Sequence, residues 1–174
     1  MSGTITVQNI QGPTTGSNAN QILVPSGHTL HAPGHVVQTV EYKAYPAYIE
    51  VTANSFVASS MQVDIAPKHN NSKIILRASW GYWLASDTNN YQIATIYRNG
   101  SNLGTGSYSC LAFHGPMRNS TYNNHAMMDT VDYPATTNST NYRVYCRPYN
   151  ANVSNLRFQW QAQVSFLQAM EIAV

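Results

Sequence analysis

The sequence predicts an all-β protein, a jelly-roll β-sandwich preceded by an extended N-terminal arm with short β pieces. Apolar residues alternate with others over residues 74–84 and again over 156–166, which is the period of a strand with one buried face. Short strand candidates follow one another at regular spacing, and no window carries a helical apolar stripe. About eight to ten such strands favour two packed sheets. An immunoglobulin-like sandwich is the alternative.

Residues 1–34 form the predicted arm, and residues 35–174 form the predicted head. The arm has two short apolar pieces, residues 4–7 and 21–25, separated by a stretch rich in Gly, Pro, Ser and Asn. Such pieces cannot bury a core alone, so we expect the arm to be ordered against identical copies or a larger scaffold. Its apolar residues are the predicted attachment contacts: Ile5, Val7, Ile10, Ile22, Leu23 and Val24.

The head begins at His35, and its strands are predicted from alternation and from the turn residues between them. They cover residues 35–43, 47–53, 56–58, 61–66, 72–84, 91–98, 102–104, 107–113, 125–131, 141–146 and 156–166, with 167–172 closing the chain. Asn99-Gly100 predicts a tight hairpin turn. Residues 115–124 and 133–141 are predicted loops. Strand parity places Trp80, Tyr82 and Trp160 in the core.

Composition narrows the classes of partner. Only 9% of residues are charged, against roughly 25% in an average soluble protein, so Asn, Ser, Thr and Tyr make the surface polar. Such a surface fits a long-lived extracellular assembly. The net charge of +2 is scattered without basic runs, which argues against nucleic-acid binding. No apolar window suits membrane insertion and no signal peptide is present, so we expect synthesis in a host cytoplasm and release by lysis.

The sequence offers no convergent set of catalytic residues. Its acids are dispersed, and it has no G-x-S-x-G, phosphate-binding glycine loop or C-x-x-C. We therefore expect no enzyme activity, no catalytic residue and no cofactor. Cys110 and Cys146 match no metal or redox spacing, which favours free thiols while leaving a disulfide open.

Two groups of histidines are candidates for metal binding, and neither is convincing. His28, His31 and His35 have helical spacing, but Pro33-Gly34 would interrupt a helix there. A ring of one histidine per copy about a threefold axis is the alternative. The other group is His114 and His125 with Asp129 and Asp132. Loop histidines more often serve as hydrogen-bonding partners, so we expect no metal.

The twelve tyrosines and three tryptophans suggest a carbohydrate-binding surface, because aromatic rings stack on sugars and Asn or Gln amides bond their hydroxyls. Trp83 and Tyr91 are among the aromatics expected to be exposed. The predicted ligand-contact residues lie in or beside the polar loops: Tyr108, His114, Arg118, Tyr122, Asn123, Tyr133 and Tyr149.

Several segments resemble tailed-bacteriophage virion proteins. They are TITVQNIQGPT (residues 4–14), NQILVPSGHTLHAPGHVVQTV (20–40), NSKIILRASWGYW (71–83), IYRNGSNLG (96–104) and SFLQAMEI (165–172). In those proteins short β pieces lead through a strand like GHVVQ, here residues 34–38, into a globular head. The layout is also similar to the trimeric jelly-roll heads of the C1q and tumour-necrosis-factor type, which have a YRNG-like hairpin and a buried terminal strand.

This resemblance implies a non-enzymatic virion structural protein whose heads form a homotrimer. Residues 1–34 would attach it to a capsid or tail protein. Because no long repetitive shaft is present, a capsid decoration or short head fibre is favoured. The alternatives are a tail fibre or knob adhesin, or a lectin-like module, that binds host-surface glycans through the head loops.

Overall fold

The computed structural model describes residues 12–17, 24, 26, 32–52, 54–84, 91–114, 122–149, 156–160 and 163–174, without the side chains of Tyr122 and Asn123. The chain divides into two compact units, residues 1–31 and 32–174. Among the predicted arm contacts, Val24 is described and is exposed. The others, Ile5, Val7, Ile10, Ile22 and Leu23, lie outside the described residues.

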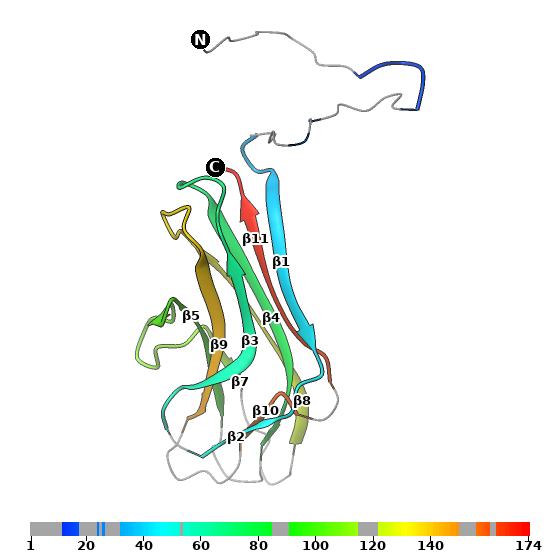
Figure 1. Cartoon of the computed structure of the whole chain (residues 1–174). Coiled ribbons are helices and arrows are strands. Elements are labelled where there is room, and N and C mark those ends of the chain that lie inside the picture. The colour runs from blue at the N-terminus through cyan, green and yellow to red at the C-terminus, as the bar shows by residue number, and fades with distance from the viewer. Residues whose placement is uncertain are drawn as a thin grey trace. The chain divides into compact units, whose positions relative to one another are not determined.

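The second unit is a sandwich of two antiparallel sheets (Figure 1). One sheet contains β1 (Val36–Ala44), β2 (Ile49–Val51), β4 (Lys73–Leu84), β8 (Tyr122–Asp132), β10 (Leu156–Phe158) and β11 (Ser165–Ile172). The other contains β3 (Val57–Ile65), β5 (Gln92–Arg98), β6 (Ser101–Asn102), β7 (Ala112–His114) and β9 (Thr140–Pro148). The predicted all-β sandwich is confirmed, and the described residues contain no helix.

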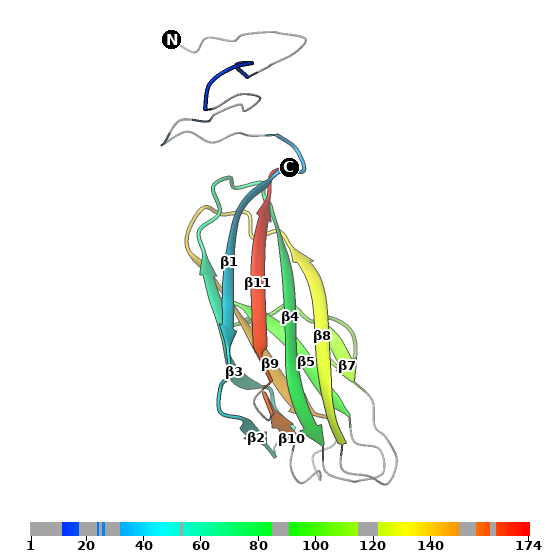
Figure 2. The same cartoon turned by 90° about the vertical axis from the view of Figure 1, so that its right-hand side faces the viewer.

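The strand order is that of a jelly roll. β10 and β11 both pair with β4 and run on one line, and their other partners are β2 and β1 respectively (Figure 2). β6 and β7 pair with β5 at its two ends. We count β1 with β2, β6 with β7, and β10 with β11 as one interrupted strand each, which leaves eight strands. Numbered along the chain, these eight strands have the order 1-8-3-6 in one sheet and 2-7-4-5 in the other. This is the double Greek key that the strand number favours.

Strand β4 supplies much of the core, as its alternation predicts. One face is buried from end to end: Ile74, Leu76, Ala78, Trp80, Tyr82 and Leu84. It belongs to the same core as the inward side chains of β9, among them Tyr142 and Val144. Trp80 is completely buried, lies 5.1 Å from Phe158 between ring centroids, and donates to Gln92. Each buried Ile or Leu among them contributes about 1.5–3 kcal/mol through burial.

The predicted continuous strand 156–166 is wrong. The chain leaves the sheet after Phe158, because Gln159 adopts a positive φ of 62° and turns its amide inward to Ser60. When pairing resumes at Ser165, the parity is reversed. Ser165 is now buried and Phe166 lies on the outer face, half-buried. Trp160 is also half-buried rather than in the core.

Several strand boundaries differ from prediction. The segments 56–58 and 61–66 form one strand, β3. The predicted strand 107–113 is reduced to β7, because Ser109 at φ 51° and a bridge between Thr105 and Cys110 close a turn instead. The predicted loop 115–124 is too long, since β8 begins at Tyr122 and pairs along β4 as far as Leu84. The hairpin turn at Asn99-Gly100 is confirmed, with the positive φ values (47° and 84°) that a type I′ turn requires.

Candidate functional site

A hollow of about 350 Å³ lies on the outer face of the β3-β9-β5 sheet. The segment before β3 supplies Asn54, Ser55 and Phe56, and the segment between β6 and β7 supplies Ser107, Tyr108 and Ser109. Tyr97, Asn102 and Arg147 complete the lining. Asn102 holds this arrangement in place, because its amide donates to Ser109 O at 2.8 Å while its side-chain oxygen accepts from Gly104 N, also at 2.8 Å.

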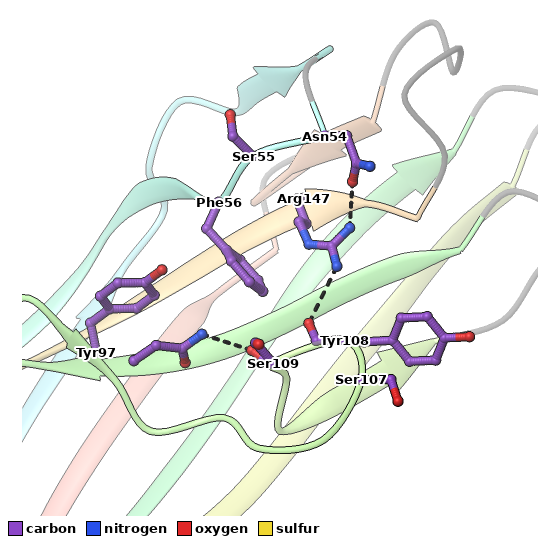
Figure 3. Close-up of a pocket in the computed structure, with 9 residues that line it drawn as sticks. Asn54, Ser55, Phe56, Tyr97, Ser107, Tyr108, Ser109 and Arg147 are labelled. Atoms are coloured by element: carbon purple, nitrogen blue, oxygen red, sulfur yellow. Dashed lines mark hydrogen bonds between the residues drawn. The ribbon is translucent and has the colours of Figure 1, made fainter.

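Arg147 lies at the centre of the hollow, with Phe56 on one side and Tyr108 on the other (Figure 3). Its Nη1 donates to Asn54 Oδ1 and to Pro148 O (3.2 Å), and its Nη2 donates to Tyr108 O (3.3 Å). The guanidinium carbon is 5.1 Å from the Phe56 ring centroid. These contacts fix the plane of the guanidinium group without neutralising its charge.

Four aromatic side chains form a partly exposed cluster beside the hollow: Tyr91, Tyr108, Phe113 and Tyr149. Their ring centroids are 4.7–5.8 Å apart. Tyr108 and Phe113 keep 44% and 42% of their surface exposed. Tyr108 and Tyr149 share a hydroxyl contact at 3.4 Å, which raises the pKa of Tyr108. Because Tyr108 also lines the hollow, the aromatic cluster and the hollow form one continuous surface.

Strand ends bring this cluster together from distant parts of the sequence. Tyr91 precedes β5, Phe113 lies in β7 and Tyr149 follows β9. Residue Gln92 of β5 pairs with both His114 and Pro148, so these three strands meet at the same end of the sheet. Backbone pairing therefore places the rings as neighbours before any ligand arrives.

A second aromatic group surrounds Arg157 on the outer face of the other sheet. The guanidinium carbon lies 5.0, 4.7 and 4.5 Å from the ring centroids of Tyr48, Trp83 and Trp160. Glu50 is within 3.7 Å of Arg157 Nε. Since the three rings are already occupied by the protein's own cation, this group is a stabilising cluster rather than an open site.

The structure does not bring all of the predicted ligand-contact residues together. Tyr108 and Tyr149 come together in the aromatic cluster. Tyr133 is exposed but follows the far end of β8, roughly 35 Å along the strand from Tyr122 at ~3.3 Å per residue. Arg118 lies outside the described residues; Tyr122 and Asn123 belong to β8 rather than to a loop, and their side chains are not described.

His114 is part of β7 and faces the core. Its ring lies 5.9 Å from Trp80 and 6.0 Å from Tyr82 between centroids, and burial lowers its pKa. It therefore packs against two aromatic side chains of the core. Asn54, Phe56 and Arg147 line the hollow but were not among the predicted ligand-contact residues. An available signal was the alternation of the predicted strand 141–146, because continuing it by one residue places Arg147 on the outer face.

Both cysteines are free thiols, with Cys146 buried and Cys110 half-buried. Among the described residues, no group of three or more His, Cys, Asp or Glu side chains is placed to hold a metal ion. The same part of the chain contains no helix long and apolar enough to cross a membrane.

No protein-family model matches this sequence, and no curated protein matches it. Among solved structures, the C-terminal domain of EclA, described as a sugar-binding protein, has a TM-score of 0.35 at 9% identity. That comparison covers 86% of this chain and 92% of EclA's domain. Dimeric latent PorU from Porphyromonas gingivalis has a TM-score of 0.36 at 11% identity, over 89% of this chain and 15% of PorU. Likeness at this level says nothing about what this chain does.

Proposed function

We propose that the head is a non-enzymatic carbohydrate-binding module, displayed on a bacteriophage virion and contacting host-surface glycans. The observation that carries this proposal is the continuity of the aromatic cluster with the hollow through Tyr108. Sugar rings stack on partly exposed tyrosine and phenylalanine faces, while their hydroxyls bond to amide and hydroxyl groups. Asn54, Ser55 and Ser107 provide such groups within the hollow.

The virion setting rests on the sequence resemblance rather than on the site. Under this proposal residues 1–34 attach the protein to a capsid or tail protein, and three heads assemble as a homotrimer. The low charge of the sequence, 9%, suits a particle that persists outside the cell. The protein would be made in the host cytoplasm and leave by lysis.

Substitution of the exposed rings tests the proposal. Tyr149→Ala and Tyr108→Ala are each expected to weaken binding to oligosaccharides on a glycan array roughly five- to thirtyfold, because loss of one aromatic–sugar contact costs ~1–2 kcal/mol. Tyr133→Ala is the matched control, since Tyr133 is also exposed but lies away from the cluster. Equal binding by all three variants, or no binding by the unchanged protein to any glycan on the array, refutes the proposal.

A second candidate function is capsid decoration by a trimer, and it is favoured by exposed apolar residues on the outer face of the β4 sheet. Met127 and Val131 on β8 are 68% and 48% exposed and lie beside half-buried Phe166 and Ile75. The exposed Arg77–Asp129 ion pair lies between the two apolar groups, so a contact between copies would bury apolar side chains on both sides of a polar centre. Light scattering should then show a trimer for the full chain and a smaller species for Met127→Glu. A monomeric full chain would rule this assembly out.

A further inference from the structure

Arg147 is a positively charged group without a negatively charged partner among the described residues. Arg77, Arg98 and Arg157 each pair with a carboxylate in this part of the chain, namely Asp129, Asp132 and Glu50. Arg147 instead donates only to the neutral oxygens of Asn54, Tyr108 and Pro148. A half-buried guanidinium that has no carboxylate partner and lines an open hollow is arranged to receive an anion.

We propose that Arg147 binds the carboxylate of an acidic sugar, so that the glycan recognised by the head carries uronic or sialic acid residues. This inference rests on the proposed carbohydrate-binding function and adds the charge of the ligand to it. A guanidinium group has five N–H donors, and the described contacts use three of them. The remaining two can form charge-assisted hydrogen bonds with a carboxylate, which is the partner that an arginine fork matches best.

The surroundings of Arg147 prepare it for this role. Asn54 and two backbone carbonyls hold the guanidinium edge, and Phe56 packs against its face at 5.1 Å. Little side-chain freedom is therefore left to lose when a ligand binds. The volume of about 350 Å³ falls at the lower end of the ~300–1,000 Å³ typical of small-ligand pockets, which suits a unit of monosaccharide size.

The rest of the surface is suited to a sugar rather than to a free inorganic anion. Phe56 and Tyr97 provide apolar edges, with their ring centroids 6.1 Å apart, and Ser55 and Ser107 provide hydroxyls at the rim. Tyr108 both lines the hollow and belongs to the aromatic cluster, where the neighbouring sugar of an oligosaccharide would stack. The acidic unit would thus occupy the hollow and the next unit the cluster.

Matched pairs of probes separate this inference from the proposed function. Trigalacturonate with its methyl ester, and sialyllactose with lactose, are each titrated into the full-length protein by calorimetry. In at least one pair, the acidic member is expected to bind tenfold or more tightly than its neutral counterpart, and this preference should shrink as salt is added. Arg147→Gln should reduce the affinity for that acidic probe at least tenfold. Its affinity for the neutral counterpart should stay within twofold of the affinity of the unchanged protein.

Arg143→Gln is the control, because Arg143 projects from the same face of β9 but does not line the hollow. It should retain the acidic preference. If Arg147→Gln does not fold, as judged by circular dichroism, Arg147→Lys takes its place. Lysine keeps the charge without the fork, so a loss of at least threefold for the acidic probe is expected.

Three results would overturn the inference. If the neutral members bind as tightly as their acidic counterparts in both pairs, sugar binding stands and the role of Arg147 is wrong. If Arg147→Gln and Arg143→Gln lose affinity for the acidic probe equally, general surface charge, not this hollow, attracts the anion. If no acidic or neutral probe binds and the glycan array is also negative, the carbohydrate-binding proposal fails together with this one.

Discussion

Glu171 on β11 should be a main source of stability at neutral pH, and its removal should be costly. The residue is fully buried. Its Oε1 accepts from Ser72 Oγ (2.7 Å), Lys68 N (2.8 Å) and His69 N (3.2 Å), and its Oε2 accepts from Gln38 Nε2 (2.6 Å). One carboxylate thus connects the last strand to β1 and to the turn between β3 and β4.

The expected cost of Glu171→Gln follows from these four bonds. Glutamine keeps the size and one acceptor oxygen, but its NH₂ group faces donors. Hydrogen bonds to charged groups contribute ~1.5–3 kcal/mol each, and two buried backbone donors would lose a charged acceptor. Allowing for some rehydration, we expect a loss of about 3 kcal/mol in the free energy of unfolding. That corresponds to a fall in Tm of roughly 6–12 °C for a protein of this size.

The pH dependence gives an independent check. Burial alone raises the pKa of Glu171, but the hydrogen bonds from Ser72, Gln38 and two backbone amides outweigh it, so the pKa lies below its ordinary value of 4.5. A depressed pKa contributes stability above the unfolded value, and this contribution is lost as the pH falls through the folded value. The difference in free energy of unfolding between the unchanged protein and Glu171→Gln should therefore be constant above about pH 5 and decrease below pH 4.5.

Thermal and urea unfolding followed by circular dichroism between pH 7 and pH 3 would measure both effects. Glu41→Gln is the control, because Glu41 is an exposed residue of β1, and it should change stability by less than ~0.5 kcal/mol. The reasoning is refuted if Glu171→Gln lies within ~1 kcal/mol of the unchanged protein at pH 7. A gap that persists undiminished to pH 3 would equally contradict it.

Three further predictions concern other parts of the head. Arg157→Ala should lower the free energy of unfolding by ~1–2 kcal/mol in urea titrations, because three cation–π contacts are lost. The control Arg77→Ala loses one exposed ion pair and should lower it by under ~0.5 kcal/mol. Equal losses would contradict a stabilising role for the Arg157 cluster. Gly104→Ala should destabilise the protein by ~1–3 kcal/mol, since the added Cβ would clash with Ser109 O and displace the wall of the hollow. Unchanged stability and unchanged sugar binding would contradict this. In a thiol titration with a disulfide reagent at pH 8, Cys110 should react slowly and Cys146 only after unfolding, because burial raises the pKa of both thiols. Fast reaction of both thiols in the folded protein would contradict their burial.

Local sequence patterns were enough to predict the buried face of the central strand and the tight hairpin turn. Alternation along β4 identified which side chains are buried, because a strand with one face in a core needs an apolar residue at every second position. The Asn99-Gly100 turn was also readable, since few dipeptides tolerate two successive positive φ values. Neither prediction required knowledge of any distant part of the chain.

The same alternation was misleading where a long-range contact interrupted a strand. Residues 156–166 alternate without a break, yet the bond between Gln159 and Ser60 ends the first strand and reverses the parity of the second. Ser60 is 99 residues away in sequence, so no local window contains the cause. Trp160 was consequently assigned to the core, although it lies on the outer face beside Arg157.

By itself, the sequence determined that this chain forms a β-sandwich and indicated that several of its tyrosines lie in the polar connections between strands. Only the tertiary structure decided which of those tyrosines are neighbours. Tyr108 and Tyr149 meet because β7 and β9 both pair with β5, while Tyr133, equally prominent in the sequence, follows the far end of β8. Burial is dictated by local periodicity, but a binding surface is assembled by strand pairing between distant segments, which periodicity does not encode.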